Sequence, residues 1–199
     1  MAPVVVNPEN VCEFRDEQSF HDWLAQHHDQ RDEVWIKIHK VASGLASITP
    51  RQAIDVVLCW GWIDGLRKGL DDNSFLQRYT PRRARSVWSQ INVANVERLI
   101  QAGRMTPHGL REVDAAKADG RWAHAYGSGQ DMKIPVDLQS AIDAEPRARK
   151  MLAGLSAQNR FALAFRVHQM KTEAGRRRKI EAFVEMLKRG ETIYPQTKK

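Results

Sequence analysis

The chain is poor in cysteine: Cys12 and Cys59 are the only two among 199 residues, and their spacing fits no metal-binding motif. Apolar runs are short, and none approaches the roughly 20 residues that a helix needs to span a bilayer. The first residues, MAPVVVNPENVCEF, lack the basic start and long apolar stretch of a secretory signal. We therefore expect a reduced, cytoplasmic protein without a transmembrane segment.

Acidic residues are scarce in the last quarter of the chain. Residues 145–199 hold 14 Lys+Arg and 5 Asp+Glu, which accounts for more than the whole net charge of +7. This imbalance suits nucleic acid, an anionic membrane surface or an acidic partner, and equally a helical face that contacts only water. The candidate basic surface comprises Arg177, Arg178 and Lys179. No nucleic-acid reader motif accompanies it, so the sequence favours the solvated face without excluding nucleic acid.

Short alternating segments predict a small antiparallel sheet near the start of the chain. Residues 34–40 alternate between two faces, which is typical of a strand. Asp71-Asp72-Asn73 is a turn sequence between two short runs, so we expect a β-hairpin over residues 62–70 and 74–80. A further short strand is expected near residues 4–6 or 11–14.

Helical spacing fills most of the remaining sequence. One helix is predicted over residues 15–28, and another starts at the N-cap Thr49 and ends at Gly61. From Ser86 onward the pattern is helical, interrupted by a linker, GSGQDMK, at 127–133. The predicted fold is therefore α+β and mainly helical. It comprises a core with the sheet and hairpin packed by helices (residues 1–126), a C-terminal helical module of three segments (134–190) and a frayed tail (191–199).

Two stretches gather residue types that bind ligands. CWGWIDG places Trp60, Trp62 and Asp64 close together, and an aromatic wall beside a carboxylate suits a small ligand with a ring or a cation. The alternative is that both indoles are core residues and that Asp64 pairs with an arginine or caps the turn.

The second stretch, YTPRRARSVWSQIN, combines arginines with a tryptophan at a predicted strand-to-helix junction. Ser86 or Ser89 could cap the helix, whose first N–H groups attract anions. Guanidinium groups such as that of Arg82 add forked donors for a carboxylate or phosphate. A structural ion pair with Asp64 or Asp55 is the alternative. The candidate ligand-binding residues of both stretches are Trp60, Trp62, Asp64, Arg78, Arg82, Ser86, Trp88 and Asn92.

Several motifs together resemble a known family. VWIKIHKVASG, AIDVVLCWGWIDG, FLQRYTPRRARSVWSQIN, LIQAGRMTPHGL and DGRWAHAY follow the order typical of YdeI/OmpD-associated proteins, also labelled bacteriocin-protection proteins. RFALAFRVHQMKTEAGRRRKIEAFVEML is similar to the C-terminal module of that family, so the resemblance covers about residues 12–189. Gly175-Arg176 and Lys179 depart from the usual pattern of the last helix. The resemblance implies a bacterial, mainly helical α+β protein connected with tolerance of bacteriocins or cationic peptides, and it supplies no catalytic mechanism.

These observations predict a non-catalytic stress-tolerance protein that binds a small anionic or zwitterionic ligand in a pocket lined by arginine and tryptophan. No metal or cofactor is expected, since the histidines are scattered and adjacent His27 and His28 diverge by about 100° on a helix. Cys59 is expected to be a structural, buried thiol. Two alternatives remain open. One is nucleic-acid or anionic-surface binding through the basic C-terminal helices, and the other is a hydrolase or transferase that uses Asp64 as general base and an arginine as anion clamp. The sequence identifies no partner protein.

Overall fold

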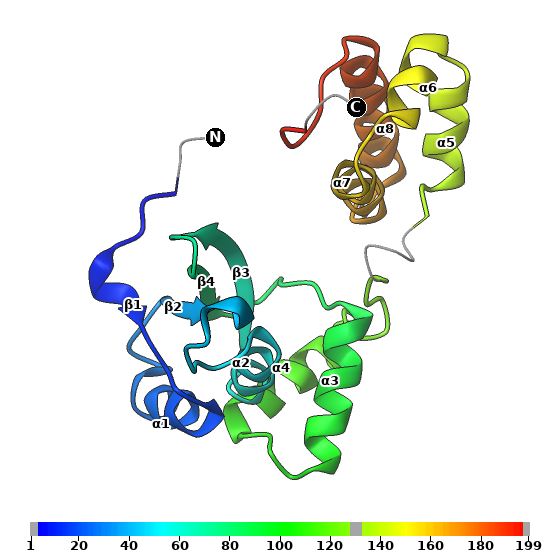
Figure 1. The fold of residues 1–199 in the computed structure, drawn as a ribbon. Coiled ribbons are helices and arrows are strands. Elements are labelled where there is room, and N and C mark those ends of the chain that lie inside the picture. Colours follow the sequence, from blue (N-terminus) through cyan, green and yellow to red (C-terminus); the bar gives the residue numbers. More distant parts are fainter. Residues whose placement is uncertain (1–3, 128–132, 197–199) are drawn as a thin grey trace. The chain divides into compact units, whose positions relative to one another are not determined.

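The computed structural model describes residues 4–127 and 133–196. It divides the chain into two compact units, Met1–Ala125 and Tyr126–Lys199 (Figure 1). The described residues form eight α-helices and one small mixed sheet, which confirms the predicted mainly helical α+β class. Most of the predicted linker lies outside the described residues. No helix in the described ranges is long and apolar enough to cross a membrane.

The first unit is built on four strands in the order β1-β2-β4-β3. Their bounds are β1 Val11–Cys12, β2 Val34–His39, β3 Trp62–Gly69 and β4 Ser74–Pro81. Strands β3 and β4 form the predicted hairpin, and β4 also pairs antiparallel with β2. Strand β1 pairs with β2 in parallel, so the sheet is mixed and not purely antiparallel as predicted. The reason is that a helix, α1 (Glu17–His27), connects β1 to β2 and returns the chain in the same direction.

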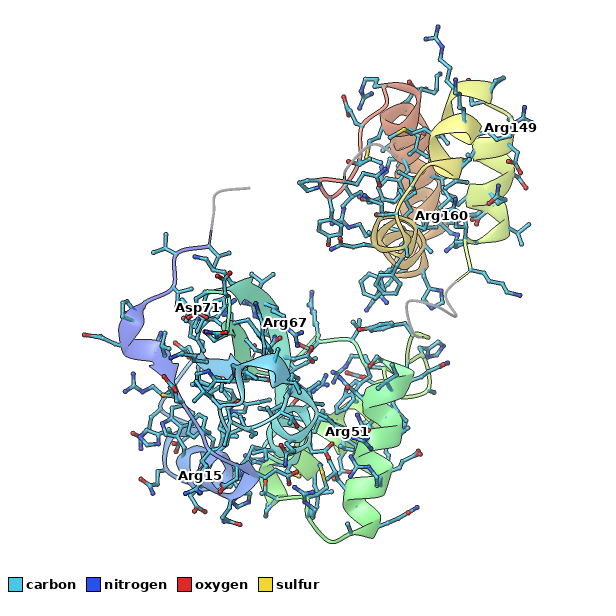
Figure 2. All side chains as sticks on the ribbon, in the orientation of Figure 1. Arg15, Arg51, Arg67, Asp71, Arg149 and Arg160 are labelled. Atoms are coloured by element: carbon cyan, nitrogen blue, oxygen red, sulfur yellow. The ribbon has the colours of Figure 1, made fainter. Side chains whose placement is uncertain are left out.

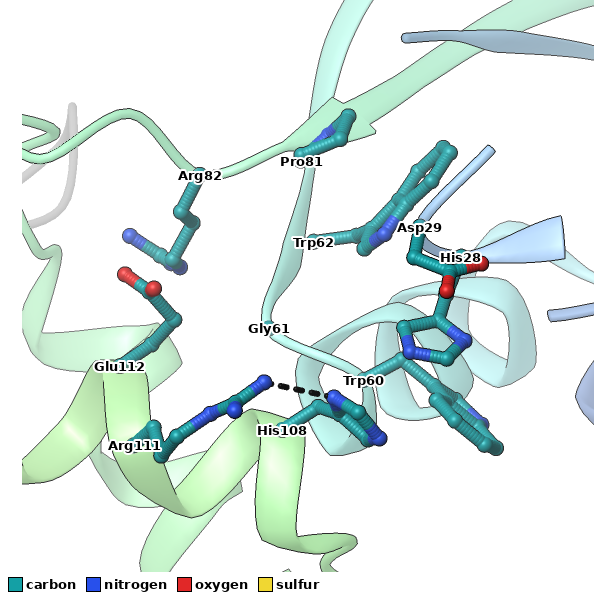
Figure 3. A pocket seen from close by; sticks show the side chains of 10 residues that line it. All are labelled: His28, Asp29, Trp60, Gly61, Trp62, Pro81, Arg82, His108, Arg111 and Glu112. Carbon is teal, nitrogen blue, oxygen red and sulfur yellow. Dashed lines mark hydrogen bonds between the residues drawn. The ribbon is translucent and has the colours of Figure 1, made fainter. Parts of the chain in front are cut away.

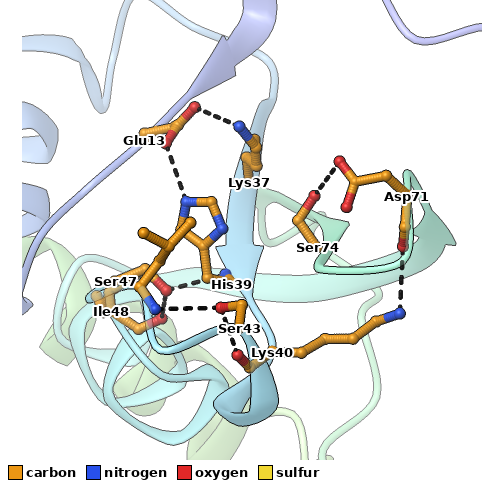
Figure 4. Close-up of polar contacts among 10 residues, drawn as sticks. Glu13, Lys37, His39, Lys40, Ser43, Ser47, Ile48, Asp71 and Ser74 are labelled. Carbon is orange, nitrogen blue, oxygen red and sulfur yellow. Dashed lines mark hydrogen bonds and ion pairs between the residues drawn. The ribbon is translucent and has the colours of Figure 1, made fainter.

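Strand β3 is an edge strand, and it is exposed beyond Ile63. A register shift between Asp64 and Arg67 bends the strand. This bend and the charge of Lys68 both discourage the edge from pairing with a strand of another chain. Figure 2 labels Arg67 on this strand and Asp71 at the hairpin turn. In the turn, Ser74 Oγ donates to Asp71 Oδ2 at 2.8 Å, and Lys40 Nζ, just after β2, donates to the Asp71 carbonyl at 3.2 Å (Figure 4). The turn is therefore tied to the neighbouring strand.

Helix α2 lies at the centre of the first unit, in contact with β3 and with three other helices. The helices after α1 are α2 Pro50–Cys59, α3 Gln90–Gln101 and α4 Pro107–Ala118. Thr49 caps α2 as predicted, with Gln52 completing a reciprocal capping box. Gly61 adopts φ 74° just beyond the helix, a conformation that glycine accepts without strain.

Helix α3 begins at Gln90, so of the two serines predicted as possible caps, Ser86 and Ser89, it is Ser89 that caps it. Its Oγ accepts from the N–H of Asn92 at 3.1 Å. Ser86 instead closes a turn, because its Oγ accepts from the N–H of Arg83 at 3.0 Å. The side chain of Trp88 is buried immediately before the helix. Burial of this indole fixes an irregular segment that helical spacing alone does not reveal.

The second unit has a helical core of its own. Its helices are α5 Val136–Asp143, α6 Pro146–Ala153, α7 Ala157–His168 and α8 Glu173–Lys188. The sequence predicted three segments, but the first is divided at Pro146, which has no N–H to continue α5 and instead starts α6. Residues 191–196 are not a frayed tail as predicted. Asn159 accepts from the N–H of Tyr194 and donates to Gln196 Oε1, both at 2.9 Å, and these bonds hold the segment against α7.

The basic run at the start of α8 is partly paired. Arg176 binds both carboxylate oxygens of Asp137 with its Nε and Nη2, at 2.5 and 2.8 Å. Arg177 and Arg178 are exposed. Lys179, the third residue of the predicted basic surface, is half-buried, and its Nζ lies 5.7 Å from the centroid of the Phe183 ring. Within the run, the exposed positive charge is therefore concentrated on Arg177 and Arg178.

Candidate functional site

A cleft of about 410 Å³ opens at the C-terminal end of α2 (Figure 3). Its walls come from the end of α1, the turn between α2 and β3, the end of β4 and the first turns of α4. Three of the predicted ligand-binding residues, Trp60, Trp62 and Arg82, line it. Segments far apart in the sequence thus meet at one concave surface.

Two glycines allow α4 to approach the end of α2. A Cβ on Gly109 would lie 2.3 Å from the carbonyl oxygen of Cys59, and a Cβ on Gly61 would lie 2.9 Å from Cγ of Glu112. Thr106, the N-cap of α4, donates from Oγ1 to the same Cys59 carbonyl at 2.6 Å. This close contact places the first turns of α4 beside Trp60 and so forms one wall of the cleft.

Aromatic rings surround Trp60 at the base of the cleft. The His108 ring stacks on the indole at 5.5 Å between centroids with 21° between planes, and the His28 ring lies 4.8 Å away. The two imidazoles are 4.0 Å apart. Trp60 and Trp62 also belong to the core of the unit, so each indole serves both packing and the cleft. Among the described residues, no group of three or more His, Cys, Asp or Glu side chains is placed to hold a metal ion.

The hydrogen bond between Arg111 and His108 defines the protonation state of the imidazole. Arg111 Nη2 lies 2.7 Å from His108 Nδ1, and a guanidinium can only donate, so Nδ1 accepts and the neutral ring carries its proton on Nε2. Burial, reinforced by the neighbouring His28 and Arg111, lowers the pKa of His108, while Asp29 acts in the opposite direction. The structure therefore favours a neutral His108 that holds Arg111 at the edge of the cleft.

Replacing Arg111 by methionine is expected to raise the pKa of His108 toward its ordinary value, because methionine keeps the apolar stem but has neither charge nor donor. Titration of the His108 ring by NMR measures this, with Arg51→Met as a control at the other end of α2. Because the pKa of His108 is lower in the folded protein than in the unfolded one, protonation of this ring destabilises the fold. The contribution to the free energy of unfolding is therefore fully present above the unfolded-state pKa of about 6.5 and is lost as the pH falls through the folded-state pKa. This loss should be smaller in Arg111→Met. A His108 pKa that stays the same or falls in this variant would contradict the assignment.

Arg82 is almost completely buried, and its guanidinium carbon lies 3.5 Å from the centroid of the Trp88 ring. Its Nη1 donates to the Val87 carbonyl at 3.4 Å. Figure 3 shows the carboxylate of Glu112 pointing toward the guanidinium. The guanidinium of Arg82, which lines the cleft, is thus packed against the indole of Trp88, which does not. Asp55, one of the two aspartates considered as its partner, instead pairs with Arg98.

Asp64, the other aspartate considered, lies on the edge strand β3 opposite Tyr79 of β4 and does not line the cleft. Although the residue is exposed overall, partial desolvation raises the pKa of its carboxyl, and its own backbone N–H and the charges of Arg82 and Arg67 act in the opposite direction. A general base would need to face bound substrate. The placement of Asp64 therefore does not favour a reaction within the cleft.

The other predicted ligand-binding residues have structural contacts away from the cleft. Arg78 Nη2 forms an ion pair with Glu33 at 2.6 Å. The ring of Trp88 packs 4.9 Å from that of Trp122. The Ser86 carbonyl accepts from Arg121 Nη1 at 2.9 Å, and Asn92 lies in the first turn of α3, where its N–H donates to Ser89.

Among the residues that line the cleft, sequence reasoning missed the acidic Asp29 and Glu112 and also His28, His108 and Arg111. Two signals in TPHGLRE could have indicated the last two. Positions 108 and 111 are three apart and share one face of a helix. Gly109 inside a helical segment often marks a close approach to another element. His28 had no comparable signal, because its neighbours in space come from distant parts of the chain.

Comparison with known proteins gives two matches. Residues 131–190 match the family described as bacteriocin-protection, YdeI or OmpD-associated, which confirms the resemblance for the C-terminal module and fits a bacteriocin-protection-like role. Residues 12–112, which contain almost all of the described helices and strands of the first unit, match a domain of unknown function, DUF8412. The resemblance predicted over residues 12–189 is thus divided between two models. No curated protein and no solved structure matches the chain. The chain therefore belongs to the DUF8412 family, and its residues 131–190 match the bacteriocin-protection, YdeI or OmpD-associated family.

Proposed function

We propose that this chain is a non-catalytic, bacteriocin-protection-like protein whose first unit binds a small anionic or zwitterionic ligand in the cleft at the end of α2. The supporting observation is the convergence there of two indoles, two imidazoles and the guanidinium groups of Arg82 and Arg111. A volume of about 410 Å³ lies within the range of roughly 300–1,000 Å³ that is common for small-molecule sites.

The chemistry of these side chains supports binding of an anion with a flat or apolar body. Arg111 is exposed and uses Nη2 for His108, which leaves further N–H donors directed by a fixed guanidinium plane. Charge-assisted hydrogen bonds to a carboxylate or phosphate are stronger than neutral ones. The indole of Trp60 and the two imidazoles offer surfaces against which a ring or aliphatic group can pack.

The same side chains do not form a catalytic arrangement. A nucleophile needs an activated group beside a base. Cys59 does not line the cleft, and burial raises the pKa of its thiol to about 11, so the thiolate is scarce near neutral pH. His108 Nδ1 already accepts from Arg111. These contacts support a binding role for the cleft.

The proposal is tested by titrating the protein with benzoate, phenyl phosphate and phenylalanine while recording tryptophan fluorescence. We expect a saturable change with at least one of these probes, since two tryptophans line the cleft. Loss of a charged hydrogen bond in Arg111→Met should weaken binding roughly 10- to 100-fold. Arg51, which Figure 2 labels, provides the control: the Arg51→Met variant should bind the probes as tightly as the unmodified protein does. Absence of binding by all three probes, or full binding by Arg111→Met, would refute the proposal.

A further inference from the structure

The walls of the cleft carry charges of both signs. Arg82 and Arg111 contribute two positive charges, and Asp29 and Glu112 contribute two negative ones. A ligand with only negative charge would therefore meet two carboxylates as well as two guanidinium groups. The balance of charges is better matched by a ligand that carries both signs.

The four charges do not act equally. Glu112 points toward the guanidinium of Arg82, so these two groups offset each other on one wall (Figure 3). Arg111 and Asp29 come from different elements, α4 and the segment after α1, and both are exposed. Within the described residues neither forms an ion pair with the protein. They are the two charges that a ligand in the cleft can reach.

The aromatic base of the cleft lies between these two groups. The charge of Asp29 raises the pKa of His108, and Arg111 contacts the same ring directly. Both charges therefore lie near the His108 ring. The rings of His28 and His108, which pack on the buried indole of Trp60, offer an apolar and π-rich surface at this place. An ammonium group is attracted by a carboxylate, and an apolar or aromatic side chain packs on aromatic rings.

Resting on the function proposed above, we propose that the ligand class is a free α-amino acid with an apolar or aromatic side chain. Its carboxylate would bind the guanidinium of Arg111, and its ammonium group would bind Asp29. The side chain would pack on the rings around Trp60. The cleft volume of about 410 Å³ lies within the range common for sites that bind small molecules.

The experiment compares phenylalanine with two derivatives, each of which lacks one of its two charges. Phenylalanine is a zwitterion, N-acetylphenylalanine is an anion, and phenylalaninamide is a cation at neutral pH. With excitation restricted to tryptophan, we expect phenylalanine to bind about 10-fold more tightly than either derivative, since each derivative loses one charged contact. Asp29→Asn should remove the advantage of phenylalanine over N-acetylphenylalanine. Arg111→Met should weaken binding of both. The matched control is Asp32→Asn, an exposed aspartate three positions along the chain.

The outcomes separate this inference from the function on which it rests. Binding of N-acetylphenylalanine as tightly as phenylalanine would overturn the zwitterion inference while leaving a cleft for anions. Retention of the full preference by Asp29→Asn would also overturn it. If none of the three molecules binds, and benzoate and phenyl phosphate fail as well, the proposed function itself falls. Circular dichroism of each variant establishes that it is folded before it is titrated.

Discussion

Replacement of Gly109 by alanine is expected to lower the free energy of unfolding of the first unit by about 3 kcal/mol, at the upper end of ordinary overpacking. The added Cβ would lie 2.3 Å from the Cys59 carbonyl oxygen and 2.8 Å from that of Leu58. Both atoms belong to the backbone of α2, so no side-chain rotation relieves the contact. Alanine normally favours a helix over glycine by up to about 1 kcal/mol, which is smaller than this cost. Helix α4 would have to move, and the hydrogen bond from Thr106 to Cys59 would be lost.

Urea unfolding followed by tryptophan fluorescence measures this effect specifically. All six tryptophans precede residue 126, so their emission reports on the first unit and not on the second. The control is Gly69→Ala on β3, where a Cβ would meet nothing within 4 Å. This variant should unfold at the same urea concentration as the unmodified protein or at a slightly higher one, because glycine weakens a strand. Equal midpoints for Gly109→Ala and Gly69→Ala would contradict the close contact that forms the cleft.

Features that depend on a few adjacent residues were predictable from the sequence. Thr49 caps α2 because its hydroxyl needs only the next turn of the same helix. The hairpin follows from Asp71 and its neighbours, whose side chains bond to the local backbone. Gly61 ends α2 because it accepts a positive φ. In each case the interaction partners lie within four positions along the chain.

Features that depend on distant partners were not predictable in the same way. Residues 191–196 are held against α7 because Asn159, 35 residues before Tyr194, bonds to the backbone of Tyr194. The choice of Ser89 over Ser86 as the cap of α3 accompanies burial of Trp88 against Trp122. The sequence shows that such residues are able to pack or to bond, but it does not show which partner they find. For this reason the helical pattern of the sequence continues into residues whose tertiary contacts hold them in an irregular conformation.

The candidate site was only partly predictable for the same reason. Trp60, Trp62 and Arg82 were identified because they belong to two short stretches of distinctive composition, and the backbone bond from the Arg82 N–H to the Gly61 carbonyl, at 3.0 Å, joins those stretches. His28 and Arg111 reach the cleft on helices whose positions depend on packing. The approach of α4 depends on Gly109, and the sequence does not show that its partner is the end of α2.

The ion pair between Asp55 and Arg98 leads to the second prediction of large effect. Asp55 Oδ1 lies 2.6 Å from Arg98 Nη2, and the side-chain exposures are 8% for the aspartate and 44% for the arginine. Replacing Arg98 by methionine leaves a buried carboxylate without its partner. We expect this change to lower the free energy of unfolding by about 3 kcal/mol, near the lower end of the range for breaking a buried pair.

Removing the other partner should cost less, because the exposed guanidinium of Arg98 can turn to water. We expect Asp55→Asn to cost about 1 kcal/mol, close to the net contribution of one hydrogen bond. In the double variant no charge is left buried, so it should be more stable than Arg98→Met alone. The measurement is again urea unfolding by tryptophan fluorescence, applied as a double-mutant cycle. Two results would contradict this account of a buried carboxylate between α2 and α3. One is a double variant whose loss of unfolding free energy equals the sum of the two single losses, and the other is a larger loss for Asp55→Asn than for Arg98→Met.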